Sequence, residues 1–245
     1  DPDGARPFGK LTSLGLYPKA SLVRRGFELG DAASAIPARL RRRYGLVLDR
    51  EVGDRIHLGR KVSNIGQLYA ELGHAERALD RGADAILFHE ELLVGYTPDL
   101  RQLAEPVDGP TTRAFQELLS GSASLILYGL TEREGDRYYI SAPVVSARGV
   151  LANYRKTHLW WQAEGLRHEP TYYTPGDRLV TVDYKGAQCG IMICYDGDFP
   201  EMTRSYANLG SSVLFWMNNR ESRGHAEVRD LAFRNSIIVA ASCCC

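Results

Sequence analysis

Three short segments of the sequence place reactive side chains directly after predicted strands. Residues 88–91 contribute carboxylates, residues 154–158 contribute a lysine and residues 193–196 contribute a cysteine. In layered α/β proteins, groups that leave the ends of sheet strands can meet in one crevice. A carboxylate, an ammonium and a thiol that meet there predict a nucleophilic site. The carboxylate deprotonates the thiol, the thiolate attacks a carbonyl or nitrile carbon, and the ammonium stabilises the resulting anion.

The side chains at the centre of this hypothesis are Glu90, Lys156 and Cys194. A free cysteine has a pKa of about 8.5 and is mostly thiol at neutral pH, so it needs a base such as this carboxylate. Taken singly, each residue has a simpler interpretation, because most buried cysteines are small apolar side chains and most glutamates and lysines are solvated. Spacing and flanking sequence must decide between the two interpretations.

The elements that would position these side chains follow from the periodicity of the apolar residues. Helices are predicted over residues 64–81, 111–120, 199–209 and 225–235. Buried strands are predicted at residues 85–88, 123–128, 212–217 and 237–243. Hairpins are predicted to pair residues 138–146 with 150–156 and 179–184 with 188–193. Antiparallel hairpins mixed with helix–strand alternation predict an α/β sandwich, with helices that cover the outer faces of two sheets.

Composition limits the class of protein. The 245 residues, 44% of them hydrophobic, suffice for one large domain or two small ones. The 30 basic and 30 acidic residues balance, which argues against a nucleic-acid partner. No apolar stretch approaches the roughly 18 residues of a membrane span, so we expect no membrane partner. The five cysteines fit neither a disulfide framework nor a metal site, so we expect a reducing cytoplasm and no metal.

The residues around the three segments resemble the signature segments of the carbon–nitrogen hydrolase (nitrilase) superfamily. Family members have Phe-Pro-Glu, four residues and then Gly-Tyr, and this chain has Phe88-His89-Glu90, four residues and then Gly95-Tyr96. The family's Tyr-Arg-Lys-x-His-Leu corresponds to 154–159, and its Ile-Cys-Tyr-Asp-x-x-Phe-Pro-Glu corresponds to 193–201. A fourth segment, 169–176, resembles the one that holds the family's second glutamate. The likeness extends over roughly residues 63–243.

The resemblance implies a four-layer α-β-β-α sandwich of the nitrilase type and a role for each matching residue. It implies that Glu90 is the general base, Lys156 stabilises the oxyanion, Cys194 is the nucleophile and Glu169 positions Lys156 and a water. His89 replaces the family's usual proline and adds a titratable group beside the base. The implied enzyme needs no cofactor. Family members commonly form dimers or larger assemblies, so we expect a homo-oligomer.

The implied activity is that of a thiol amidohydrolase. It would cleave a non-peptide C–N bond of a small linear amide or N-carbamoyl compound through an acyl-enzyme on Cys194 and release ammonia. The Cys-Tyr-Asp context resembles the amidase and carbamoyl-hydrolase branches more than the nitrile-cleaving branch. A nitrilase that converts a nitrile to an acid and ammonia is one alternative. A non-catalytic interaction protein that keeps the fold is another.

Substrate contacts are expected from side chains beside the implied catalytic segments. The candidate substrate-binding residues are Tyr96, Trp160, Tyr195 and Asn219. Trp160, Trp161, Tyr172 and Tyr173 either line a pocket for an apolar or aromatic acyl group or pack in the core, and the sequence favours neither. Asn218 and Arg220 follow a predicted strand, as Asn219 does, and could contact polar groups of a substrate.

Residues 63–245 form the predicted carbon–nitrogen hydrolase domain, and residues 1–62 are an N-terminal segment of open placement. Family chains normally continue past the strand equivalent to 237–243, through a hairpin that often contains Asp-Pro-x-Gly. In this chain that pattern occurs only at residues 1–4. One hypothesis is that residues 1–62 complete the sandwich in place of the C-terminal portion. The alternative is a truncated C-terminus and an unrelated N-terminal arm.

Overall fold

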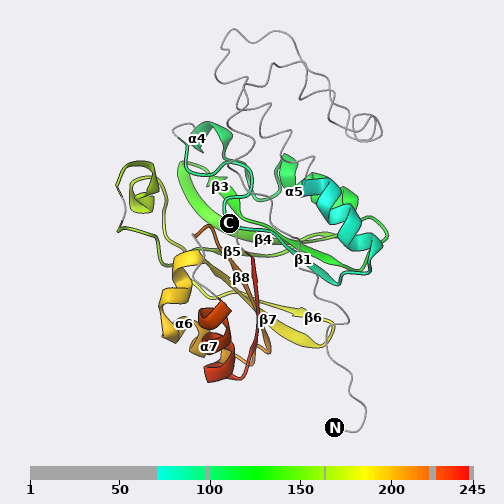
Figure 1. Cartoon of the computed structure of the whole chain (residues 1–245). Helices are drawn as coiled ribbons and strands as arrows, with labels where there is room; N and C mark the ends of the chain where they lie inside the picture. Colours follow the sequence, from blue (N-terminus) through cyan, green and yellow to red (C-terminus); the bar gives the residue numbers. More distant parts are fainter. Residues whose placement is uncertain (1–70, 98–99, 163, 221–224, 243–245) are drawn as a thin grey trace, which may run out of the picture.

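The structure is a computed structural model that describes residues 71–97, 100–162, 164–220 and 225–242. Within these ranges the chain forms two β-sheets that lie face to face, with helices on the two outer sides (Figure 1). The hypothesis that residues 1–62 complete the sandwich lies outside the described residues, as does the predicted start of the first helix.

The first sheet contains the strands that precede two of the candidate catalytic residues. Its strand order is β1-β2-β4-β3, and β5 also pairs with β4. The strands are β1 (Ala85–Leu87), β2 (Leu125–Leu127), β3 (Leu130–Glu134), β4 (Arg137–Ser146) and β5 (Gly149–Arg155). Strand β1 is parallel to β2, and β4 and β5 form the predicted antiparallel hairpin.

The second sheet has the strand order β6-β7-β8-β9, and its strand β7 directly precedes Cys194. Its strands are β6 (Thr181–Tyr184), β7 (Ala187–Ile193), β8 (Val213–Met217) and β9 (Ile238–Ser242). The pair β6–β7 is the second predicted hairpin, whereas β7, β8 and β9 run parallel. Because parallel strands end at the same edge of a sheet, the residues that follow β7 and β8 emerge side by side.

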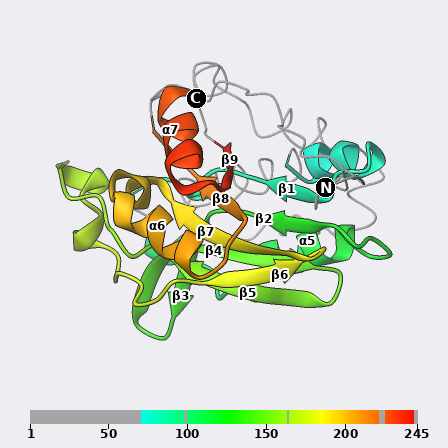
Figure 2. The same ribbon diagram turned by 90° about the horizontal axis from the view of Figure 1, so that it is seen from below.

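Helices cover both outer faces (Figures 1 and 2). A helix over residues 71–80 and α5 (Pro110–Leu118) pack on the first sheet, where Leu72 and Phe115 share an apolar cluster with Ile126. Helices α6 (Pro200–Asn208) and α7 (His225–Asn235) pack on the second sheet. The remaining short elements are α4 (Leu100–Leu103) and the 3-10 helices η2 (Gly165–Arg167), η3 (Glu169–Thr171) and η4 (Cys194–Asp198).

A single apolar core lies between the sheets. Leu127 and Ile140 of the first sheet belong to the same buried cluster as Ile191 and Phe215 of the second. Both sides of β8 are buried, which explains why its sequence is an unbroken apolar run rather than an alternating one. The predicted four-layer α-β-β-α sandwich is confirmed.

Most of the predicted elements within the described residues are present, with ends that differ by at most two residues. Strand β3 was not predicted, because the apolar alternation that marks a half-buried strand is lost at its charged end, Glu132–Glu134. Strand β3 follows β2 after only two residues, so the first sheet continues where the apolar run stops.

Candidate active site

A buried ion-pair cluster joins three of the predicted site residues. Lys156 Nζ donates hydrogen bonds of 2.8 Å to Glu90 Oε1 and 2.8 Å to Glu169 Oε1. The three side chains have no exposed surface. Glu90 lies in the turn that follows β1, Lys156 directly follows β5, and Glu169 begins η3. The chain therefore brings an ammonium and two carboxylates from distant segments to one point.

The cluster fixes the charge of the lysine and changes the basicity of Glu90. Burial acts to lower the pKa of Lys156, but the negative charges of Glu90 and Glu169 hold it above its ordinary value. Lys156 is therefore an ammonium. Burial also raises the pKa of Glu90, and the Lys156 charge only partly opposes this rise. A carboxylate with a raised pKa is a stronger base than an exposed one.

Cys194 lies at the sharp turn between β7 and η4, with its backbone in the left-handed region at a φ of 43°. That conformation costs a residue other than glycine about 1–2 kcal/mol. Its thiol and the Glu90 carboxylate are close enough for each to shift the other's pKa. Glu90 Oε2 is buried, and no hydrogen-bond donor among the described residues pairs with it. This oxygen is free to receive the thiol proton.

The resting state of the pair is a thiol beside a carboxylate. Burial and the negative charge of Glu90 together raise the pKa of Cys194 to about 12, against the opposing charges of Lys156 and Arg220. The backbone N–H of Asn219 also acts on the sulfur in the opposing direction. Transfer of the thiol proton to Glu90 would remove the negative charge that disfavours the thiolate.

Glu169 is held by hydrogen bonds at both oxygens. In addition to Lys156, the hydroxyl of Tyr96 donates to Oε1 at 2.6 Å. The backbone N–H of Trp160 donates to Oε2 at 2.6 Å. Two predicted substrate-binding residues thus contact the buried cluster itself, Tyr96 through its phenol and Trp160 through its main chain. Because its oxygens are fixed in this way, Glu169 fixes the ammonium in turn.

Asp196, which is not among the candidate residues of the sequence analysis, links the turns that follow β5 and β7. Its carboxylate is buried, and Oδ1 accepts the backbone N–H of His158 at 3.0 Å. Oδ2 accepts the hydroxyl of Tyr154 at 2.8 Å and the backbone N–H of Ile193 at 2.9 Å. The ends of β5 and β7 are therefore held together by one side chain. The ring of His158 also contacts Asp196, at 3.1 Å.

Gly129 packs its backbone directly against the Glu90 turn. Its N–H donates to the carbonyl oxygen of His89 at 3.1 Å, and its own carbonyl oxygen accepts the N–H of Leu92 at 3.0 Å. A Cβ atom at this position would lie 2.5 Å from Glu90 Cα. Only glycine allows the two backbones to approach so closely. In the sequence Gly129 is only a glycine between two strands. Its role depends on its contact with the Glu90 turn, which the sequence does not reveal.

Glu91 is a second buried glutamate beside the cluster. Its Oε1 accepts the hydroxyl of Tyr173 at 2.8 Å and that of Thr131 at 3.1 Å. Burial raises the pKa of Glu91 to about 8, with hydrogen bonds from Tyr173 opposing the rise and the charge of Glu90 adding to it. At neutral pH Glu91 is therefore mostly an uncharged acid. Tyr173 is 5% exposed, so it packs in the core rather than lining a pocket.

The other predicted substrate-binding residues lie around Cys194. The rings of Trp160 and Tyr195 meet edge to face at 4.8 Å between centroids. Tyr195 is buried, and its ring also contacts Phe199 at 5.2 Å. Asn219 reaches the sulfur through its main chain, as described above. Arg220 points to the Cys194 backbone, and its Nη2 donates to the Cys194 carbonyl oxygen at 2.7 Å.

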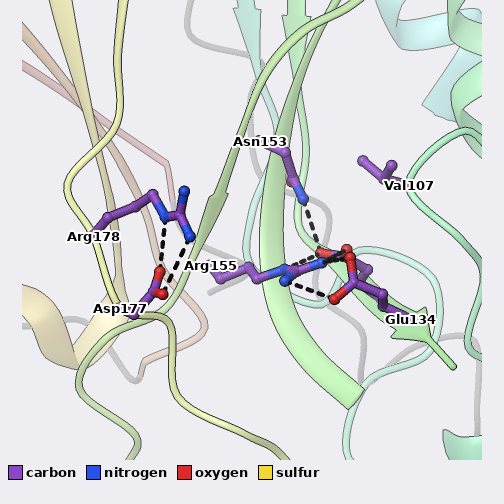
Figure 3. A pocket seen from close by; sticks show the side chains of 7 residues that line it. Val107, Glu134, Asn153, Arg155, Asp177 and Arg178 are labelled. Carbon is purple, nitrogen blue, oxygen red and sulfur yellow. Dashed lines mark hydrogen bonds and ion pairs between the residues drawn. The ribbon is translucent and has the colours of Figure 1, made fainter. Parts of the chain in front are cut away.

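A pocket of about 400 Å³ elsewhere in the first sheet does not contain this cluster (Figure 3). Its polar side chains largely satisfy one another: Arg155 pairs with Glu132 and Glu134, and Asp177 pairs with Arg178. Of the candidate catalytic residues, none lines it. The pocket is therefore a hollow between ion pairs rather than the place where the thiol would meet a substrate.

Two further findings concern the described residues as a whole. Among them, no three or more His, Cys, Asp or Glu side chains are arranged to hold a metal ion. No helix in the described ranges has the length and apolar character that crossing a membrane requires.

Comparison with known proteins places these features in context. A family model described as carbon–nitrogen hydrolase matches residues 60–245. An (R)-stereoselective amidase of a Pseudomonas species is 34% identical over 137 residues, which cover 55% of this chain and 48% of the amidase. A nitrilase of Pyrococcus abyssi is 32% identical over 145 residues, covering 57% of this chain and 53% of the nitrilase.

Among solved structures, an amidase from a Nesterenkonia species superposes with a TM-score of 0.64 at 23% identity. The superposition covers 74% of this chain and 70% of that one. At this identity the likeness supports the fold. The chain spans about half the length of the curated relatives it matches.

Proposed function

The chain belongs to the carbon–nitrogen hydrolase family, and on this premise we propose that it is a thiol amidohydrolase acting on a small linear amide or N-carbamoyl compound. The observation that carries the proposal is the placement of a buried carboxylate–ammonium–carboxylate cluster beside a cysteine at a strained turn. A structural ion pair has no need for an adjacent thiol. A buried thiol has no need for a neighbouring carboxylate oxygen that lacks a donor.

In the proposed first step, Glu90 Oε2 takes the proton from the Cys194 thiol. The electron pair left on sulfur attacks the amide carbon and forms a tetrahedral oxyanion. Protonation of Glu90 removes one of the two negative charges that neutralise Lys156. The lysine charge then becomes available to the oxyanion at the moment when that anion forms. One such preorganised donor contributes roughly 3–4 kcal/mol to lowering the barrier.

In the second half of the proposed reaction, protonated Glu90 gives its proton to the departing nitrogen. The C–N bond breaks, ammonia or an amine leaves, and a thioester remains on Cys194. Glu90, again a carboxylate, activates a water that hydrolyses the thioester to the acid and the free thiol. Glu169 does not transfer a proton in this scheme. Held by Tyr96 and Trp160, it keeps Lys156 in place throughout the cycle.

The proposal extends to a substrate with an apolar or aromatic acyl group. The edge-to-face contact between the Trp160 ring and the ring of Tyr195, the residue that follows Cys194, supports this choice. The Pseudomonas relative is named as an amidase, which favours amides, whereas the Pyrococcus relative is named as a nitrilase. We therefore place amides and carbamoyl compounds before nitriles. The predicted homo-oligomer and cytoplasmic location remain part of the proposal.

The test is a panel of small amides, N-carbamoyl amino acids and nitriles, assayed by ammonia release. We expect the native chain to turn over at least one amide or carbamoyl compound and Cys194→Ala to turn over none. Cys189→Ala is the matched control, because Cys189 is a buried free cysteine of the same strand region and should be dispensable for turnover. Turnover by Cys194→Ala would refute the mechanism. Turnover of nitriles alone would favour the nitrilase, and a fully inactive native chain would favour the non-catalytic alternative.

A further inference from the structure

Arg220 makes a set of contacts that the proposed mechanism does not use. The residue lies three positions after β8, and its Nη2 donates to the carbonyl oxygen of Cys194 and to Asp198 Oδ1, each at 2.7 Å. Its Nη1 lies 3.5 Å from Glu227 Oε1. The guanidinium also lies over the Trp216 ring, 5.4 Å from the ring centroid. An arginine held in this way by both acids and a ring has little freedom to rotate.

The carbonyl oxygen that Arg220 contacts belongs to the strained residue of the site. Because Cys194 has a φ of 43°, its peptide group is turned away from the direction that β7 would give it. Two donors hold this carbonyl oxygen in its turned position: Trp216 Nε1 at 3.1 Å and Arg220 Nη2 at 2.7 Å. Unusual backbone conformations of this kind persist only where surrounding contacts enforce them.

Arg220 is also the second positive charge near the sulfur. Lys156 is shared between two carboxylates at 2.8 Å, and Arg220 lowers the pKa of Cys194 in the same direction as Lys156 does. Asp198 and Glu227 offset part of the Arg220 charge. Those same acids orient the guanidinium, which leaves its Nη2 hydrogens committed to protein acceptors rather than to a ligand.

We propose that Arg220 is a positioning residue of the nucleophile, which holds the Cys194 carbonyl group so that the strained turn directs the thiol toward Glu90. This inference rests on the proposed function, because it gives Cys194 the role of nucleophile. The sequence suggested a contact with polar groups of the substrate for this position. In the structure the guanidinium instead faces the backbone of the reacting residue. Loss of Arg220 should therefore weaken the reactivity of the sulfur itself, whatever the substrate is.

The test measures the reactivity of Cys194 without turnover. The full chain is treated with iodoacetamide between pH 6 and pH 10, and mass spectrometry of the Cys194 peptide gives the alkylation rate at each pH. We expect Arg220→Met to slow alkylation at neutral pH about tenfold and to move the rate profile to higher pH, because one pKa unit changes the thiolate population tenfold. Arg220→Lys, which keeps a charge but not the planar fork, should react at least threefold more slowly than the native chain.

Arg229→Met is the matched control, because it removes an exposed arginine of α7. It should alkylate at the native rate. Arg220→Met at the native rate, with a circular dichroism spectrum like the native one, would overturn the proposal. So would a raised KM with unchanged alkylation, which would make Arg220 a substrate contact. If Arg220→Met does not fold, Arg220→Lys decides: slower alkylation supports the proposal and a native rate overturns it.

The alkylation test of Arg220 and the ammonia-release test of the proposed function can fail independently. If the native chain releases ammonia but the Arg220 variants alkylate normally, only the positioning role fails. If the native chain has no turnover with any compound of the panel, the proposed function fails, whereas slower alkylation of Arg220→Met would still support the link between Arg220 and the sulfur.

Discussion

The hydroxyl of Ser242, at the end of β9, donates a hydrogen bond of 2.7 Å to the carbonyl oxygen of Phe88, the residue that follows β1. These residues belong to different sheets. The bond joins the sheets at the edge from which the Glu90 turn departs. It therefore ties the Glu90 turn to the sheet that carries Cys194.

Ser242→Ala should remove this hydrogen bond between the two sheets. Loss of one hydrogen bond of this kind costs about 0.5–1.5 kcal/mol of unfolding free energy, which urea unfolding measures. Because the Glu90 turn loses its tie to the second sheet, kcat should fall more than KM changes. Ser242→Thr keeps the hydroxyl and is the control. An Ala variant with native kcat would show that the bond does not position Glu90.

Gly129→Ala should displace Glu90, the proposed general base. The added methyl group would lie 2.5 Å from Glu90 Cα, and backbone cannot yield as a flexible side chain can. We expect a loss of about 1–3 kcal/mol of unfolding free energy together with loss of turnover. Gly73→Ala, whose methyl group would meet only the Arg77 side chain at 3.6 Å, is the control for a glycine replacement. Native activity in Gly129→Ala would contradict the close approach.

The raised pKa of Glu91 predicts how the free energy of unfolding depends on pH. Its pKa rises from an ordinary value of 4.5 to about 8 in the folded chain. Between these values the folded chain binds a proton that the unfolded chain does not, so this residue makes the unfolding free energy fall as pH increases. Glu91→Gln should flatten the fall between pH 5 and pH 8, measured by urea unfolding at both. As a control, Glu117→Gln, which replaces an exposed glutamate, should leave this pH dependence of the unfolding free energy unchanged. If the unfolding free energy of Glu91→Gln fell with pH as much as that of the native chain, Glu91 would not be a buried neutral acid.

Lys156→Met should separate catalysis from folding. The substitution keeps most of the buried volume but removes the ammonium, so the oxyanion loses its charged donor and turnover should fall about 10²–10³-fold. Glu90 and Glu169 would face each other without a cation, and the pKa of Glu90, which the Lys156 charge lowers, should rise further. Lys185→Met, which breaks the partly exposed pair with Asp84, is the control and should keep its turnover. Turnover within a few-fold of native in Lys156→Met would exclude the lysine from the oxyanion site.

The sequence carried the parts of the site that are encoded locally. Cys194 and Lys156 each follow an apolar strand, and the residues that flank them form recognisable patterns, so their neighbourhood was predictable. The two hairpins were predictable for the same reason. At residues 185 and 186 the turn between β6 and β7 has positive φ values of 49° and 77°, as expected of a two-residue hairpin connection.

The supporting contacts were not predictable, because each joins residues that are far apart in the chain. Ser242 lies 154 positions from Phe88, and Tyr173 lies 82 positions from Glu91. Arg220 lies 26 positions from Cys194, beyond a strand whose register decides whether it points to the turn or to the solvent. A serine, a tyrosine or an arginine in a loop gives no local signal of its partner.

The division of the site between the two sheets has a consequence for how such a chain can change over time. Glu90 and Lys156 follow strands of the first sheet and Cys194 follows a strand of the second, so the apolar layer between the sheets sets the distance between the Glu90 carboxylate and the Cys194 thiol. Catalytic groups must be held to within about 0.5 Å of their productive geometry. On the proposed function, a substitution at Leu127 or Phe215 would shift the two groups relative to each other. A substitution in that layer that the fold tolerates can still abolish the chemistry.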